Sequence, residues 1–172
     1  MDLQILADVD ETCKFIVKES KHFISAENGS IMLINGEDRK LFVKAAFGTE
    51  WKPKMRLSPG EGIAGDVIET GKSELINDVS MDPRYKSGAA QIKSVLCVPL
   101  KGKNSNFGVI NMSRASKELF TLEDLKLLRS IAIYASIAVE NAMNFAKLNH
   151  VADEILSHAA TLEMWHEDSK IN

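Results

Sequence analysis

The stretch KSVLCVPLKGKNSNFGVINMS, from Lys93 to Ser113, decides the fold. Two short runs rich in branched side chains, Lys93 to Leu100 and Phe107 to Ser113, flank the polar segment Lys101 to Asn106. This pattern predicts an antiparallel hairpin, because branched and aromatic side chains favour strands while a polar segment with glycine favours a turn. The centre of the chain therefore carries an antiparallel sheet.

A second hairpin is predicted nearer the N-terminus. The runs Gly29 to Ile34 and Lys40 to Phe47 are separated by a polar segment that begins with Asn35 and Gly36. Asn-Gly readily adopts the positive φ angles of tight β-turns, so we expect the chain to reverse there.

The segment between the two hairpins mixes short elements. Gly62 to Thr70 reads as a short helix that ends at Gly71, and a brief strand follows at Ser73 to Ile76. A loop is expected from Asn77 to Gln91.

Helices flank this centre. All 10 glycines and all 4 prolines lie between Gly29 and Gly108, so both ends of the chain lack helix breakers. Near the N-terminus, apolar or small residues recur at steps of three and four, which places them on one helix face: Leu6, Val9, Cys13, Ile16, Ser20 and Phe23.

The C-terminal helix is predicted to begin at Thr121, an N-cap residue with Asp124 three positions later. Its core-facing stripe is Leu125, Leu128, Ala132, Ala135, Val139, Ala142 and Ala146. A helix that continued to about Trp165 would span roughly 65 Å, so part of it must project from the domain. The projecting stripe is Val151, Ile155, Ala159 and Leu162. A second copy of the chain is the simplest partner for it, and a severed linker is the alternative.

Charge and composition exclude several classes of function. The net charge is -3 and like charges do not cluster, which argues against nucleic-acid binding. The longest uncharged apolar run, Ser130 to Val139, is about half of the roughly 20 residues that a membrane span needs. The first residues lack the features of a secretory signal, and Cys13 and Cys97 are isolated. We therefore expect a cytoplasmic protein without a membrane span.

Several segments together resemble a GAF domain over about residues 3 to 148. The resemblance rests on their order and intervals: Gly60-Glu-Gly-Ile-Ala-Gly65, Asn77-Asp-Val, Asp82-Pro-Arg-Tyr85, Ile92 to Leu100, Phe107-Gly-Val-Ile-Asn111 and Phe120-Thr-Leu-Glu-Asp-Leu125.

The resemblance implies an α+β, three-layer fold of the profilin or PAS type. A central antiparallel sheet of about six strands would carry the terminal helices on one face and a small-molecule pocket on the other. It also implies a sensor that regulates an output domain such as a histidine kinase or a cyclase. The expected organisation is a GAF domain over residues 1–148 and a helical extension or linker over 149–172.

The catalytic readings of the sequence are weaker. The glycines Gly60, Gly62 and Gly65 match a phosphate-loop spacing, but the surrounding pattern is not a βαβ unit, which favours a structural turn. Cys97 lies in an apolar strand without a partner thiol, so a reductase of free methionine sulfoxide is the least favoured alternative. The histidines at positions 150, 158 and 166 are too far apart along a helix to share a metal. We expect no enzyme activity, no metal and no identifiable cofactor.

Binding of a small molecule is the favoured hypothesis. Cyclic-nucleotide-binding members of the resembled family carry Asn-Lys where this chain has Arg114-Ala115, and a Glu where it has Leu125, so we expect cyclic nucleotides to bind weakly or not at all and leave another small ligand open. By position, the residues expected to face the pocket are Ser30, Phe47, Ala64, Asp78, Tyr85, Ile92, Ser94 and Asn111. We expect a homodimer, formed through the terminal helices, that transmits the occupancy of the pocket to an output domain. A constitutive dimerisation module without a ligand is the alternative.

Overall fold

The structure is a computed structural model that describes residues 8–49, 54–85 and 91–168. Its elements follow in the order α1 (Val9–Phe23), β1 (Asn28–Ile34), β2 (Leu41–Phe47), β3 (Arg56–Leu57), α2 (Gly62–Thr70), β4 (Glu74–Ile76), η2 (Val79–Met81), β5 (Ser94–Lys101), β6 (Asn106–Arg114) and α3 (Leu122–Asp168). The strands form one six-stranded sheet in the order β3-β2-β1-β6-β5-β4, and every pair is antiparallel. The predicted α+β class and the expected number of strands are confirmed.

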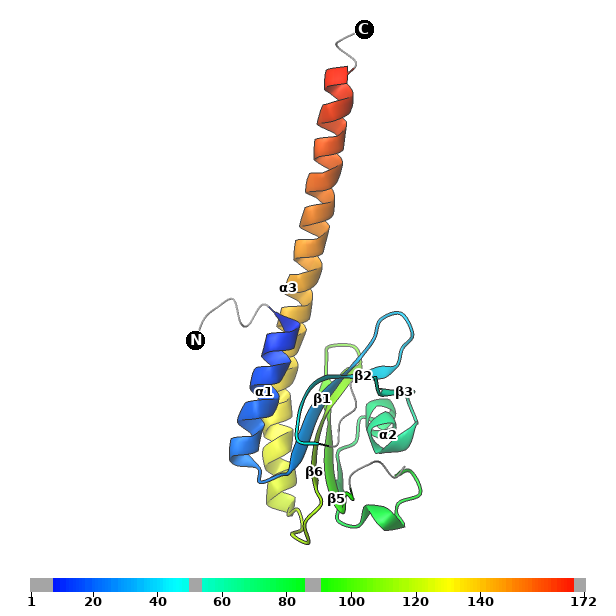
Figure 1. The fold of residues 1–172 in the computed structure, drawn as a ribbon, viewed down its shortest axis with the longest axis vertical. Coiled ribbons are helices and arrows are strands. Elements are labelled where there is room, and N and C mark those ends of the chain that lie inside the picture. Colours follow the sequence, from blue (N-terminus) through cyan, green and yellow to red (C-terminus); the bar gives the residue numbers. More distant parts are fainter. Residues whose placement is uncertain (1–7, 50–53, 86–90, 169–172) are drawn as a thin grey trace.

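Two layers of helix cover the two faces of this sheet, as Figure 1 shows. Helices α1 and α3 lie side by side on one face, and α2 lies on the other. The core on the α1/α3 face includes Cys13, Ile31, Leu96, Ile110 and Leu128, all fully buried. The core on the α2 face includes Met32, Val67, Cys97 and Val109, also fully buried. The three-layer arrangement is therefore confirmed.

Both predicted hairpins form, but the turn of the first differs from the prediction. The Asn35 N–H donates to the Lys40 carbonyl at 2.9 Å, so the loop spans six residues. The residue with positive φ is Arg39, at 59°, and Gly36 does not share this conformation. The prediction of positive φ at Asn-Gly was wrong because the Asn35 side chain instead accepts the Glu37 N–H at 2.7 Å, which starts a wider turn.

The glycines around α2 have structural tasks. Gly71 ends the helix with φ 67°, and its N–H donates to the Val67 carbonyl at 2.9 Å. The Gly60 N–H donates to the Gly65 carbonyl at 2.8 Å, and a Cβ on Gly65 would lie 2.5 Å from the Ser58 carbonyl oxygen. The turn therefore closes on its own backbone, in agreement with the structural interpretation of the glycine motif.

Helix α1 buries one face, though not up to its last residue. Its N-cap Asp8 accepts the N–H groups of Asp10 and Glu11, and Cys13 and Val17 enter the core. Phe23 was predicted to belong to the buried stripe, but it is 65% exposed. The helix ends there, and the next residue, Ile24, takes the core position in an extended conformation. Leu6 lies outside the described residues.

Helix α3 begins with reciprocal capping, as predicted. The Asp124 N–H donates to Thr121 Oγ1 at 3.1 Å, and the Thr121 N–H donates to Asp124 Oδ2 at 2.8 Å. Its stripe is buried from Leu128 to Ala142, but Ala146 is exposed because the helix has already left the sheet. The helix then projects far from the body of the domain (Figure 1). No helix among the described residues is long and apolar enough to cross a membrane.

Candidate functional site

The α2 face of the sheet gathers most of the residues predicted to face a ligand. Ser30 and Asn111 are opposite each other on β1 and β6, and Asn111 Nδ2 donates to Ser30 Oγ at 3.4 Å. Ala64 of α2 and Ile92, which lies just before β5, are buried in the core between α2 and the sheet, and Tyr85 packs against the same core. These residues come from four separate segments of the chain, so the fold brings them into one layer.

This layer is closely packed. Apolar side chains that are fully buried surround the Ser30–Asn111 pair: Met32, Val67, Cys97 and Val109. A molecule bound between the sheet and α2 would have to displace some of them.

Phe47 and Ser94 lie on the opposite face of the sheet. Phe47 packs against the α1/α3 core, with Lys21 Nζ 5.2 Å from its ring centroid. The reason is a bulge in β2, where Ile31 pairs with Ala45 but Met32 pairs with Val43. The extra residue reverses the alternation of side chains, so Phe47 does not share the face of Val43.

Ser94 faces the helices because it alternates in phase with Leu96 and Val98, which both belong to the α1/α3 core. Its hydroxyl is buried and has no hydrogen-bond partner among the described residues. Asp78 is exposed, and its carboxylate caps η2 by accepting the Ser80 N–H at 3.1 Å and the Ser80 hydroxyl at 2.5 Å.

An ion-pair network forms around Arg84, and its local sequence carries no signal for it, because two of the three carboxylates belong to distant segments. The Arg84 guanidinium donates to Asp82 and to Asp66 of α2 at 2.7 Å each, and to Glu74 of β4 at 3.0 Å. The hydrogen bond from Arg84 holds the pKa of the Asp82 carboxyl below its usual range, and the bond to Asp82 raises the pKa of Arg84. One side chain thus ties the loop after η2 to both α2 and the edge strand.

Both cysteines are fully buried. Burial raises the pKa of the Cys13 thiol to about 12, although Lys44 partly opposes this shift. Burial likewise raises the pKa of Cys97. A thiol is nucleophilic only as its thiolate, so neither cysteine is suited to redox chemistry in this fold. The described residues contain no group of three histidine, cysteine or carboxylate side chains that could hold a metal.

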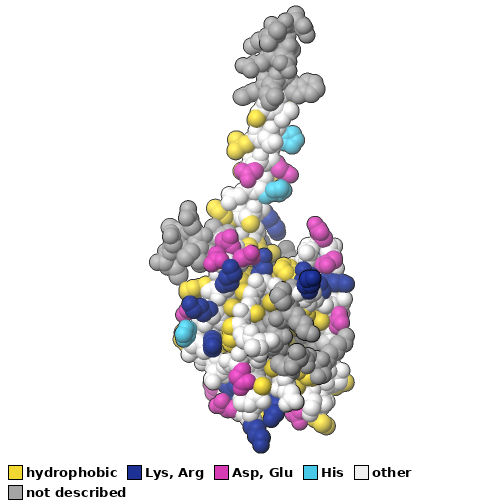
Figure 2. Space-filling view, viewed as in Figure 1, with side chains coloured by type: hydrophobic (Ala, Val, Ile, Leu, Met, Phe, Trp, Pro, Cys, Tyr) yellow, Lys and Arg dark blue, Asp and Glu magenta, His cyan; other side chains and the backbone are white. Residues whose placement is uncertain are grey.

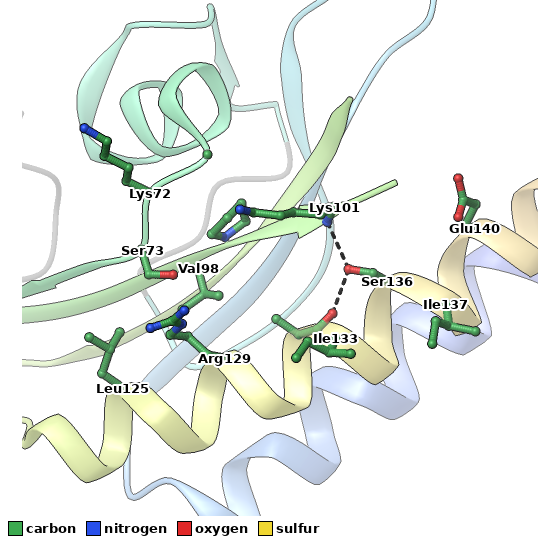
Figure 3. A pocket seen from close by; sticks show the side chains of 13 residues that line it. Lys72, Ser73, Val98, Lys101, Leu125, Arg129, Ile133, Ser136, Ile137 and Glu140 are labelled. Carbon is green, nitrogen blue, oxygen red and sulfur yellow. Dashed lines mark hydrogen bonds between the residues drawn. The ribbon is translucent and has the colours of Figure 1, made fainter. Parts of the chain in front are cut away.

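A hollow of about 650 Å³ lies where α3 passes the end of β5 (Figure 3). Its wall includes Lys101 of β5 and Arg129 and Ser136 of α3. The Lys101 N–H donates to Ser136 Oγ at 3.0 Å, so a side chain of the helix provides the hydrogen-bond acceptor for the last N–H of β5. The sequence carried no signal for this hollow, because its residues belong to elements that meet only in the fold.

Helix α3 exposes a mostly apolar stripe that runs from its packed part into its projecting part. Residues spaced by seven are all exposed: Tyr134 (75%), Asn141, Leu148 (68%), Ile155 (63%) and Leu162 (65%). Ile137 and Val151, three positions after Tyr134 and Leu148, are also exposed. Figure 2 shows hydrophobic side chains along this helix, outside the body of the domain. A seven-residue apolar repeat is typical of coiled coils.

Comparison with protein families gives one match that covers most of the chain. A family model described as "GAF domain" matches residues 7–140. Relatives with similar sequence are regulators and phosphodiesterases. The formate hydrogenlyase transcriptional activator of Salmonella typhimurium is 24% identical over 95% of this chain, which corresponds to 25% of that protein. The dual 3',5'-cyclic-AMP and -GMP phosphodiesterase 11A of Takifugu rubripes is 32% identical over 72% of this chain and 16% of that protein. The chain thus spans a quarter or less of the length of these relatives.

Solved structures with the same fold agree. The GAF domain of a phosphoenolpyruvate-protein phosphotransferase from Coxiella burnetii matches with a TM-score of 0.75 at 19% identity, over 84% of this chain and 96% of that one. The free methionine-R-sulfoxide reductase of Neisseria meningitidis matches with a TM-score of 0.73 at 17% identity, over 80% of this chain and 81% of that one. At these identities the likeness concerns the fold alone.

Proposed function

Because this chain belongs to the GAF domain family, we propose that it is a sensor domain that dimerises through α3 and regulates an output domain attached to that helix. The observation that carries the proposal is the exposed seven-residue repeat from Tyr134 to Leu162. Similar regions occur in transcriptional activators and phosphodiesterases, which supports a regulatory role. We place the end of the sensor domain near residue 148 and assign residues 149–172, of which 169–172 lie outside the described residues, to the extension or linker that connects it to the output domain.

The proposed partner is a second copy of the chain, oriented in parallel. In such a pair Tyr134, Asn141, Leu148, Ile155 and Leu162 occupy the a positions of a coiled coil. Asn141 at an a position favours one register, because two asparagine side chains can hydrogen bond only when aligned. The parallel orientation points both helices toward the same side, where two output domains would meet.

Helix α1 has a smaller part in this dimer than the sequence suggested. Its Cys13 and Val17 pack within the domain, against the sheet and α3. The stripe predicted on α1 is therefore used mainly for folding, and the proposed seam is formed by α3.

The ligand of the sensor is proposed to bind on the α2 face, beside Ser30, Asn111 and Tyr85. Buried polar groups there offer hydrogen bonds that an apolar core would not. The Arg84 network could control access, since it fastens the neighbouring loop to α2. Regulatory function rather than catalysis is proposed because both thiols are fully buried and burial raises the pKa of each. The methionine sulfoxide reductases share the fold at low identity only.

Two measurements on the chain of 172 residues test the proposal. Sedimentation equilibrium gives its oligomeric state, and native mass spectrometry with thermal denaturation detects a bound small molecule, because a ligand of the folded state raises stability. A dimer that carries or is stabilised by a small molecule supports the sensor. A dimer without any ligand favours the constitutive dimerisation module, and a monomer at tens of micromolar contradicts both.

A further inference from the structure

The hollow beside α3 lies on a different part of the domain from the α2 face. Strand β4 pairs with β5 only from Val95 to Cys97, whereas β5 continues to Lys101. The last residues of β5 therefore have no strand neighbour on the outer side, and α3 passes across the space that remains. The hollow of about 650 Å³ forms there, with Ser136 of α3 bonded to the strand at its inner end.

Three cationic side chains from three separate elements line this hollow. Lys72 follows α2, Lys101 ends β5, and Arg129 lies on α3. In Figure 3 the Arg129 side chain lies beside Val98 and the Lys101 side chain runs along β5, whereas the Lys72 side chain extends away from both. Among the residues that the structure describes, no carboxylate forms an ion pair with any of the three. The carboxylate in the lining is Glu140.

Ion pairs neutralise some other cations among the described residues. Lys14, Lys44, Arg84 and Lys126 each have a carboxylate partner. Around the hollow, in contrast, three positive charges outnumber the single negative charge, and like charges gathered at a concave surface create a positive potential. An anion that entered would be attracted by all three.

The floor of the hollow is apolar. Its apolar lining residues include Val98 and Pro99 of β5, which are buried, and Leu125 and Ile133 of α3, which are more accessible. A ligand that fits both features has an apolar body and an anionic group with several oxygen atoms, because a guanidinium can donate two parallel hydrogen bonds to such a group.

We propose that this hollow binds a small organic anion, held at its phosphate or carboxylate group by Arg129 and Lys101 and at its apolar body by Leu125 and Ile133. Such a ligand would bridge α3 to the edge of the sheet, because Arg129 belongs to the helix and Lys101 to the last position of β5. It would therefore restrain the helix that leaves the domain. The hollow is separate from the α2 face, although it shares Ile137 with the exposed stripe of α3.

Titration of the isotope-labelled chain with phenyl phosphate and with inorganic phosphate, followed by amide NMR at constant ionic strength, tests the site. We expect saturable shifts centred on Ser73, Lys101 and Ser136, with tighter binding of phenyl phosphate because of the apolar floor. The variant Lys101→Gln/Arg129→Gln should weaken binding by at least about tenfold. The control Lys18→Gln/Lys54→Gln removes the same charge elsewhere and should bind as the unmodified chain does.

A single substitution tests the geometry of the site without changing its charge. Arg129→Lys keeps the charge but loses the planar fork, so it should bind phenyl phosphate more weakly than the unmodified chain. Shifts that rise linearly without saturation, or affinities that are the same in all these variants, would overturn the proposal. Shifts centred on Ser30 and Asn111 instead would assign the anion to the α2 face and would also overturn it.

Discussion

Ser136 of α3 and Lys101 of β5 are joined by a hydrogen bond of 3.0 Å from the Lys101 N–H to the Ser136 hydroxyl. The same hydroxyl donates to the Ala132 carbonyl at 2.7 Å. Ser136 is buried, and the bond connects the free end of the sheet to the helix that leaves the domain. The position of α3 over the sheet thus depends on a polar contact as well as on apolar packing.

Replacing Ser136 by alanine should lower the free energy of unfolding by about 1–2 kcal/mol, because the Lys101 N–H loses its partner at a partly buried position. Urea denaturation followed by circular dichroism measures the change. Ser130→Ala is a matched control, since Ser130 also donates to a carbonyl of its own helix, that of Lys126, but is exposed. Equal losses in both variants would contradict the role assigned to the contact between helix and strand.

Replacing Arg84 by alanine should cost about 1–2 kcal/mol of stability, because three carboxylates that share its guanidinium would then repel one another. Arg84→Lys should restore only part of this loss, since an ammonium cannot reproduce the planar fork. As a control, Lys126→Ala removes an exposed pair with Glu123 and should change stability by less than about 0.5 kcal/mol. Denaturation of the three variants in parallel gives the comparison.

The lowered pKa of Asp82 predicts a specific response to acid. Arg84 keeps the folded pKa below the reference value of 3.8, so the pair contributes stability above that pH and loses it as the pH falls through the folded value. Between about pH 4 and pH 2, the unmodified chain should therefore lose more stability than Asp82→Asn. Thermal denaturation across this range measures the two slopes. Parallel slopes would count against the assignment.

The pKa of Glu27 is also lowered in the folded protein, so this carboxyl contributes to the same loss of stability in acid and needs its own control. The Ala115 N–H, followed by Ser116, lowers the pKa of the Glu27 carboxyl. The variant Asp82→Asn should still lose some stability as the pH falls. This dependence of stability on pH should become weaker when Glu27→Gln is added.

Both cysteines should resist thiol reagents in the folded protein. At pH 8 the thiolate fraction of Cys13 is small, because its pKa is about 12, and Cys97 is shifted in the same direction by burial. Ellman's reagent should react with both thiols after denaturation in guanidinium chloride and with neither before it. Rapid reaction of one thiol in the native chain would show that the core around it opens.

The proposed dimer predicts a position-specific effect of charge on α3. Ile155→Lys/Leu162→Lys should weaken association by at least about tenfold, because it places lysines in the apolar seam. Leu156→Lys/Ala160→Lys adds the same charge on exposed positions away from the seam and should leave association unchanged. Sedimentation equilibrium gives both affinities. Equal effects of the two variants would exclude the seam.

Sequence reasoning succeeded where the signal is local. The Thr121–Asp124 cap, the end of α2 at Gly71 and the two hairpins all follow from residues within a few positions of one another. Capping, turn chemistry and side-chain alternation act over such distances, so one segment is enough to reveal them. The long helix was also predictable, because its repeat continues without an interrupting glycine or proline.

The candidate site depended on relations that no single segment carries. The bulge opposite Ile31 and Met32 turned Phe47 to the α1/α3 face, although regular alternation would place it with Val43. The contact between Ser30 and Asn111 joins residues 81 positions apart. The hollow likewise forms only because Lys101 of β5 and Arg129 of α3 come to line the same cavity.

The sequence by itself therefore determined the main helices and hairpins, their order and the excess of apolar surface on α3, but not the short strand β3 or the turn η2, which lies in the predicted loop. Only the tertiary structure decided which side chains share a face, which polar groups find partners and which cations remain without one. The physical reason is range: propensity and capping are properties of neighbouring residues, whereas burial and electrostatic pairing depend on how distant segments pack.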